Sequence, residues 1–180
     1  MAFDISALKV LIKKIFPPKK SIYTVDTTGD GNADALLIKA LNLIMPILIP
    51  KQIEIGGFST KSFDVKNFEL SDYGKIYLDE IPINVSKKDY DVEKLKDHFA
   101  LYHKGEKFAI DDLLRGKLAG RMIALGDTID ILIKIDEDGL EKFSEGKHTF
   151  KFKSKIIPTL EFNFELGKEN LNQSFDSVHN

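Results

Sequence analysis

Two stretches near the C-terminus alternate apolar and polar residues so regularly that they predict a β-hairpin. Thr149 to Ile156 and Thr159 to Leu166 flank Pro158. Because side chains alternate between the two faces of a strand, this pattern places the apolar residues on one face. The residues expected to face the core are Phe150, Phe152, Ile156, Leu160, Phe162, Phe164 and Leu166. The residues expected to form opposed charges on the solvent face, which would fix the register, are Lys151, Lys153 and Lys155 with Glu161 and Glu165.

A second hairpin is predicted just before the first. From Thr128 to Ile135, every second residue is isoleucine, and the preceding Gly126-Asp127 pair suits a tight two-residue turn. We therefore expect Lys117 to Leu125 to pair with Thr128 to Ile135. Ser21 to Val25 also has the composition of a strand.

The remaining segments give a mixed pattern. Lys75 to Val85 is expected as one strand, at a sheet edge because of Pro82, and Ser62 to Leu70 as a strand with a bulge. The spacing of Val92, Leu95, Phe99 and Tyr102 predicts a helix over Asp91 to Lys104. The apolar run Leu36 to Met45 fits either a buried strand or a buried helix.

These elements predict a mainly β protein: an antiparallel β-sandwich or jelly-roll-like domain with one or two inserted helices, or alternatively an α+β fold. A chain of 180 residues is long enough for one domain with a sizeable core. We expect residues 1–20 to form an N-terminal helix and residues 21–166 a single β-rich domain. The polar tail, residues 167–180, is expected to be mobile or to act as an arm on a neighbour.

The N-terminal segment is predicted to be an amphipathic helix that ends at Pro17-Pro18. Its apolar residues fall on one side and its lysines towards the other. The residues expected to contact a membrane or a partner are Phe3, Leu8, Lys9, Leu11, Lys13, Lys14 and Ile15. Three interpretations stay open: the stripe docks on the protein's own body, it is accepted by a partner subunit, or it rests on an anionic membrane surface.

One loop gathers acidic oxygens and glycines. It runs from Asp26 to Asp34 with the sequence Asp-Thr-Thr-Gly-Asp-Gly-Asn-Ala-Asp, between the predicted strand at Ser21 to Val25 and the apolar run from Ala35 to Pro50. Oxygen ligands on a backbone bent around the ion are what calcium prefers. The alternative is a metal-free hairpin turn in which Asp and Asn side chains bond their own backbone.

This loop resembles the calcium loops of EF-hand, dockerin and integrin-repeat type proteins. The resemblance covers nine residues and implies calcium as a cofactor. It implies that Gly31 makes the turn and that the ligands are Asp26, Thr28, Asp30, Asn32 and Asp34.

Composition narrows the function classes. The chain has no cysteine, which excludes disulfides and thiolate metal sites, and a formal net charge of −2 with only two arginines, which argues against a nucleic-acid partner. No signal-peptide pattern, transmembrane run or catalytic motif appears in the sequence. We expect a soluble or assembly-associated protein.

The sequence therefore favours a non-enzymatic structural or interaction protein, such as a subunit of a virion or surface complex, with protein partners or a homo-oligomer. One alternative is a peripheral membrane or lipid-binding module that uses the N-terminal helix. A second alternative is a carbohydrate-binding or hydrolytic β domain with a cleft lined by Tyr73, Tyr77 and Tyr90.

Overall fold

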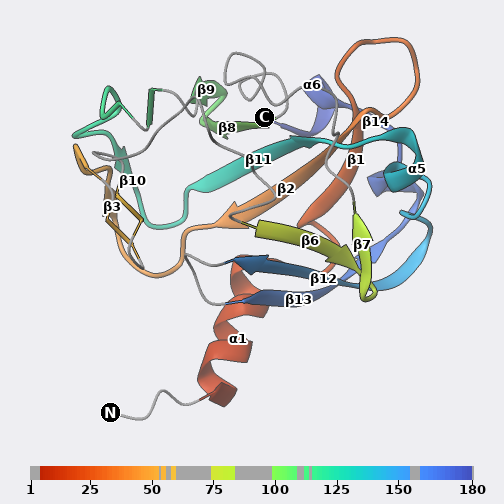
Figure 1. Cartoon of the computed structure of the whole chain (residues 1–180), viewed down its shortest axis with the longest axis horizontal. Coiled ribbons are helices and arrows are strands. Elements are labelled where there is room, and N and C mark those ends of the chain that lie inside the picture. Colours follow the sequence, from red (N-terminus) through yellow and green to blue (C-terminus); the bar gives the residue numbers. More distant parts are fainter. Residues whose placement is uncertain are drawn as a thin grey trace.

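The computed structural model describes residues 5–52, 54–55, 58–59, 74–83, 99–108, 112–113, 115–154 and 159–179. The protein is mainly β, as predicted, and its strands are mostly antiparallel (Figure 1). The largest sheet has the order β14-β1-β2-β11-β8-β9. Its strands are β1 (Ile22–Asp26), β2 (Ala35–Leu41), β8 (Phe99–His103), β9 (Glu106–Phe108), β11 (Thr128–Lys134) and β14 (Gln173–Ser174).

A four-stranded sheet has the order β13-β12-β6-β7. Its strands are β6 (Gly74–Leu78), β7 (Ile81–Ile83), β12 (Gly146–Ser154) and β13 (Leu160–Leu166). Two short ribbons complete the described strands: β3 (Ile47–Leu48) pairs with β10 (Met122–Ile123), and β4 (Glu54–Ile55) pairs with β5 (Phe58–Ser59). The described helices are α1 (Ile5–Ile15), α5 (Glu137–Leu140), the 3-10 turn η2 (Lys168–Asn170) and α6 (Phe175–Val178).

The main core lies between the two larger sheets. Ile22, Leu36 and Ile133 from the six-stranded sheet pack in one cluster with Phe150 and Phe164 from the four-stranded sheet. A second cluster lies on the opposite face of the six-stranded sheet. The first four residues of β2 are therefore all buried, which explains why their sequence shows no alternation. The run Leu36 to Met45 was expected to form either a strand or a helix. Its first part, up to Leu41, is a strand.

The C-terminal hairpin is confirmed. β12 and β13 pair antiparallel with Phe150 opposite Phe162 and Lys151 opposite Glu161. The Lys151 Nζ atom lies 3.2 Å from the Glu161 carboxylate, so this predicted charge pair occurs. Glu165 lies opposite Lys147 instead of one of the three predicted lysines. Ile156 and Lys155 lie outside the described residues.

The predicted hairpin between Lys117 to Leu125 and Thr128 to Ile135 is wrong. β11 forms as expected, but its neighbours are β2 and β8. Both edges of β11 are therefore already hydrogen-bonded. The short strand β10, which lies within Lys117 to Leu125, pairs with β3 instead.

The single strand predicted over Lys75 to Val85 is also wrong. Its described part is a hairpin: β6 and β7 pair antiparallel across a turn at Asp79 and Glu80, which have φ angles of 49° and 68°. Two consecutive residues with positive φ are typical of a type I′ turn. β7 is the edge strand of its sheet, as Pro82 predicted.

The helix predicted over Asp91 to Lys104 is wrong for its last part, because Phe99–His103 is strand β8. Ala100 lies opposite Leu132, and Phe99 lies opposite Ile133, so apolar residues occupy both faces of this strand. Apolar residues on both faces can imitate a helical spacing. Residues 91–98 and the strand predicted over Ser62 to Leu70 lie outside the described residues.

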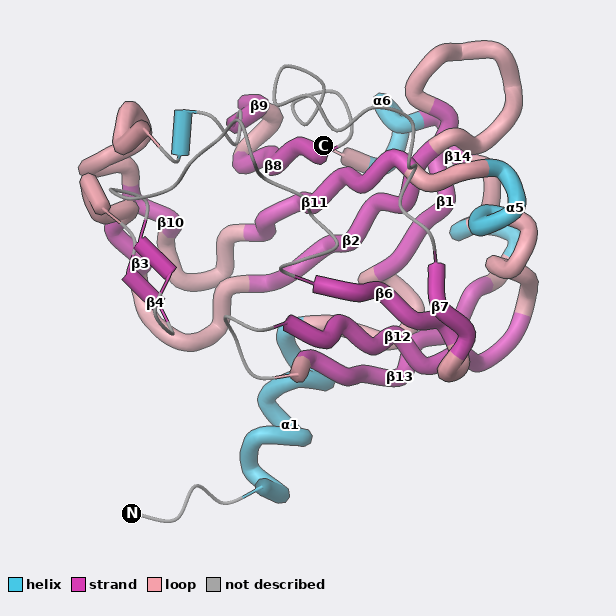
Figure 2. The backbone as a smooth tube through the Cα atoms, viewed as in Figure 1, coloured by secondary structure: helices cyan, strands magenta, loops and turns pink. Residues whose placement is uncertain are grey.

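The tail is packed on the body of the protein, which corrects the expectation of a mobile segment or an arm. β14 pairs parallel with β1 (Figure 2). Asn170 is buried, and its side-chain amide donates to the backbone carbonyls of Lys19 (3.1 Å) and Ile22 (3.4 Å). The N–H of Asn172 donates to the Thr24 hydroxyl at 2.8 Å. Long-range bonds of this kind, rather than local pattern, fix the tail.

Candidate functional site

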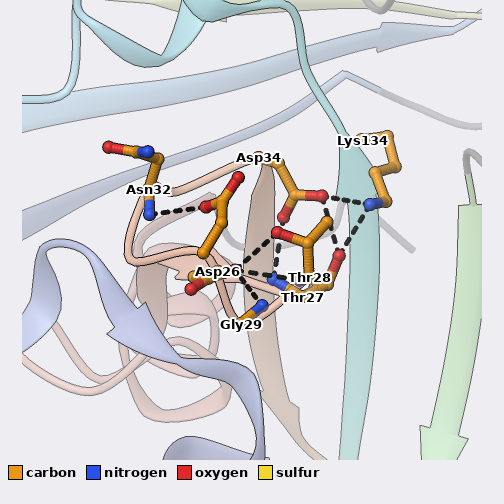
Figure 3. Close-up of polar contacts among 8 residues, drawn as sticks. Asp26, Thr27, Thr28, Gly29, Asn32, Asp34 and Lys134 are labelled. Carbon is orange, nitrogen blue, oxygen red and sulfur yellow. Dashed lines mark hydrogen bonds and ion pairs between the residues drawn. The ribbon is translucent and has the colours of Figure 1, made fainter.

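The loop between β1 and β2 folds around the carboxylate of Asp26 (Figure 3). One carboxylate oxygen accepts the N–H groups of Thr28 (2.8 Å) and Gly29 (2.7 Å), and the other accepts that of Gly31 (2.7 Å). These bonds, that of Gly31 most of all, lower the pKa of Asp26 to about 2, because they favour the ionised form. Gly29 and Gly31 have φ angles of 81° and 90°, which only glycine adopts without strain.

Asp34 closes the loop from its other end. Its carboxylate accepts the N–H and the hydroxyl of Thr27, both at 2.8 Å, and pairs with the ammonium of Lys134 on β11 (Figure 3). Burial acts to raise the pKa of Asp34, but the bonds from Lys134 and Thr27 outweigh it and lower that pKa. The ammonium of Lys134 therefore supplies the positive charge next to Asp34.

The predicted calcium ligands do not turn their oxygens towards one point. Asp30 accepts the N–H of Asn32 at 2.8 Å, and the oxygens of Asp26 and Asp34 are occupied as described above. Calcium needs six to eight oxygens, whereas this set contains the ammonium of Lys134. In the part of the chain that the structure describes, no group of three or more His, Asp or Glu residues could hold a metal ion. The residues present do not fit a calcium ion in this arrangement. Calcium binding, expected from the sequence, is therefore left to a direct test, and this geometry favours the metal-free turn.

The residues predicted to contact a membrane or a partner lie on α1, except Phe3, which is outside the described residues. Lys13 and Lys14 are exposed, Leu11 is half-buried, and Ile15 packs against the core. Leu8 and Lys9 lie in the first half of the helix. Figure 1 shows that this half points away from the body, while the end of the helix reaches β13.

The structure also contains a polar pocket that the sequence did not predict. Three neighbouring strands contribute Lys39 from β2, Asp130 from β11 and Tyr102 from β8, which lie in one cross-strand row. The pocket has a volume of about 390 Å³, and its lining residues are Lys39, Tyr102, Lys104, Gly105, Thr128, Asp130 and His179.

Buried charge lies at this pocket. The side chain of Lys39 is 3.2 Å from Asp130 and also donates to the carbonyl of Val178. Asp130 is 4% exposed, and burial raises its pKa although Lys39 opposes the shift. Of the three buried side-chain atoms without a hydrogen-bond partner in the described residues, two belong to residues that line the pocket: Oδ1 of Asp130 and Nδ1 of His179. Unpaired buried polar atoms are costly and are frequent at functional sites.

The turn after β8 supports the rim of the pocket. Asp127 accepts from His103 at 2.9 Å and from the N–H of Ala124 at 2.8 Å, and it lies 3.2 Å from the ammonium of Lys104. These contacts, with the bond from His103 first, lower the pKa of Asp127 to about 2. Lys104 is thus held at the rim by an ionised carboxylate.

Only one of the three tyrosines expected to line the cleft of the second alternative lies in the described residues, so that cleft stays a prediction. Tyr77 lies on β6, with the ammonium of Lys153 4.8 Å from its ring centroid, while Tyr73 and Tyr90 lie outside the described residues. The tyrosine at the pocket is Tyr102. The sequence signal that could have indicated the pocket is a charged residue inside each of two apolar strands: Lys39 in β2 and Asp130 in β11.

No family model and no curated protein matches the chain. The function must therefore be argued from the geometry alone. Among the described helices, none is long and apolar enough to cross a bilayer.

Proposed function

We propose that this chain is a non-enzymatic structural protein that works as a subunit of a larger assembly and binds its neighbours through α1. The observation that carries the proposal is that the end of α1 packs on the body of the protein while Val10, further towards its start, is exposed. Ile12 and Ile15 pack against the core, and Phe16, directly after the helix, stacks on Phe162 with ring centroids 4.2 Å apart. Val10 is exposed, and the first half of the helix points away from the body (Figure 1).

Helix stability supports this proposal. α1 has 11 residues, and an isolated helix shorter than about 12 to 15 residues is marginal in water. Most of the stability of such a helix comes from packing of its apolar face. A neighbouring subunit that covers the projecting half would supply that packing.

Light scattering on the full chain tests the proposal. We expect the mass to exceed the single-chain value of 20.3 kDa and to rise with concentration. Val10→Glu should lower it, because it charges the exposed part of the helix. The new Glu lies three and four residues before Lys13 and Lys14, so helix formation itself is favoured.

The matched control is Ile81→Glu, which charges an exposed aliphatic residue on the edge strand β7 and should leave the mass unchanged. A chain that stays at its single-chain mass at every concentration would refute the proposal, as would equal effects of the two variants.

A second candidate function rests on the pocket. Its polar lining, which includes Lys39, Tyr102 and Asp130, suits a small ligand with several hydroxyl groups, which can both donate and accept. Titration of the labelled protein with simple sugars tests this. We expect the amide signals of Gly105 and Thr128 to shift, and we expect Asp130→Asn to abolish these shifts. Unshifted signals in the unmodified chain would reject the ligand-binding function.

A further inference from the structure

The end of the molecule around β3 and β10 exposes large apolar side chains. We call this region the tip and define it as residues 43–52 and 115–126, which lie at one end of the six-stranded sheet (Figure 2). Its exposed large apolar residues are 40% to 64% exposed. They are Ile44, Met45, Ile47, Leu48, Met122 and Leu125. Exposed apolar residues are common singly, but their concentration at one end of the molecule marks an interaction surface.

The tip has a packed underside. Ile49, Leu118 and Ile123 are buried and form a small core with Phe108. The tip is thus a two-sided structure whose inner side chains hold it in place and whose outer side chains face solvent. Its exposed apolar residues do not result from an unfolded segment.

The backbone of the tip is hydrogen-bonded within the protein. Ile49 donates its N–H to the carbonyl of Arg121 (2.9 Å), and Gly120 donates to the carbonyl of Ile49 (2.9 Å). The side-chain amide of Asn42 donates to the carbonyls of Met45 (2.9 Å) and Ala124 (3.0 Å). Backbone groups that enter hydrocarbon must be satisfied internally, because lipid tails offer no partner. The backbone groups named above already have such partners within the protein.

The two segments of the tip also approach each other closely. Gly116 has a φ angle of 69°, and a Cβ atom at this position would lie 2.4 Å from the carbonyl oxygen of Lys51. Glycine is required here both for its backbone conformation and for space. The loops of the tip are therefore held against one another.

The charge of the tip differs from that of the whole chain. It contains Lys51, Arg115, Lys117 and Arg121 and no acidic residue, whereas the chain has a net charge of −2. Arg121 pairs with Glu106, and Lys117 lies 2.6 Å from Asp112, but both pairs are largely exposed and therefore weak. Cationic side chains around an apolar projection complement the phosphates of an anionic lipid surface.

The charge of the tip selects lipid as its occupant. Four cationic residues without an acidic one complement the negative surface of an anionic bilayer, and the aliphatic side chains between them match its acyl region. We propose that the tip inserts its exposed apolar side chains into an anionic lipid surface, with its lysines and arginines at the headgroups. This site is distinct from α1 and does not depend on the proposed assembly.

Vesicle flotation with the full chain tests the inference. We expect binding to vesicles of phosphatidylcholine that contain about one third phosphatidylserine, and little binding to phosphatidylcholine alone or at high salt. Leu48→Ser with Met122→Ser removes a cross-strand pair of exposed residues and should lower the partition coefficient at least about tenfold. Ile81→Ser is the matched control, since Ile81 is 50% exposed on β7, and should bind like the unmodified chain.

A second double variant, Ile44→Ser with Met45→Ser, lies outside the strands and repeats the test if the first variant does not fold. Failure of the unmodified chain to float with the anionic vesicles would overturn the inference. So would equal binding of the Leu48/Met122 and Ile81 variants. A loss of self-association on changing Leu48 and Met122, without vesicle binding, would instead identify a second copy of the chain as the occupant of the tip.

Discussion

Asn42 is expected to be the residue on which the geometry of the tip depends most. It is 7% exposed and lies between β2 and β3. Its side-chain amide donates to the carbonyls of Met45 (2.9 Å), Ala124 (3.0 Å) and Ile123 (3.2 Å), and its Oδ1 accepts the N–H of Ile44 at 3.4 Å. It therefore ties both segments of the tip to each other.

The cost of Asn42→Ala follows from these bonds. An amide has two N–H groups, so its three donor contacts amount to about two full hydrogen bonds. Each bond contributes about 0.5 to 1.5 kcal/mol, and buried carbonyls left without a partner add to the loss. We expect the free energy of unfolding to fall by about 2 to 4 kcal/mol, which for a chain of this length lowers the melting temperature by about 5 to 10 °C.

Urea unfolding measures this change, and amide hydrogen exchange localises it. Exchange at Ile44 should accelerate, because its acceptor is removed, while exchange in the β12–β13 hairpin should not change. The control is Asn163→Ala, which removes an exposed side chain bonded to the Thr149 hydroxyl and should cost less than about 0.5 kcal/mol. A loss below about 1 kcal/mol for Asn42→Ala, or equal losses for both variants, would refute this reasoning.

The other predictions concern the acidic loop and one close contact. Asp26→Asn should lower the melting temperature at pH 7. A carboxylate whose pKa is lowered by folding stabilises the folded state at every pH above the ordinary pKa of aspartate, about 3.9. The difference in melting temperature between the unmodified chain and the variant should disappear as the pH falls towards about 2, the pKa of folded Asp26. Calcium or a chelator should leave thermal melting unchanged, since Lys134 already neutralises Asp34. Binding heat with a calcium-dependent rise in melting temperature would contradict that geometry. Gly74→Ala should destabilise by about 1 to 3 kcal/mol in urea unfolding, because the new Cβ would lie 2.2 Å from the Phe152 ring.

The sequence predicts the β12–β13 hairpin well because one of its faces is solvated. Phe150 and Phe162 are buried while Glu161 is exposed, so burial and polarity alternate with the strand period. β8 lacks this signal because both of its faces are covered: Ala100 packs in the second cluster, and Phe99 packs against the main core. Where both faces of a strand are buried, its sequence cannot distinguish it from a helix.

The acidic loop shows a different limit. Its Asp and Gly spacing fits two structures equally well, a cation site and a turn whose carboxylates bond their own backbone. The deciding residue, Lys134, comes from β11, a strand distant in sequence. The pocket likewise depends on the pairing of Lys39 with Asp130, which only the register of β2 and β11 establishes. Local pattern does not contain this information.

The two proposals together predict an effect of α1 on lipid binding. An assembly that presents several tips to one vesicle binds more tightly than a single chain, because later contacts are intramolecular. Val10→Glu should therefore weaken flotation at concentrations where the unmodified chain is assembled, although α1 touches no lipid. At concentrations where the unmodified chain is a monomer, the variant should bind like it. A loss of binding in the monomeric range would instead mean that α1 itself contacts the membrane, and light scattering on the same samples separates the two ranges.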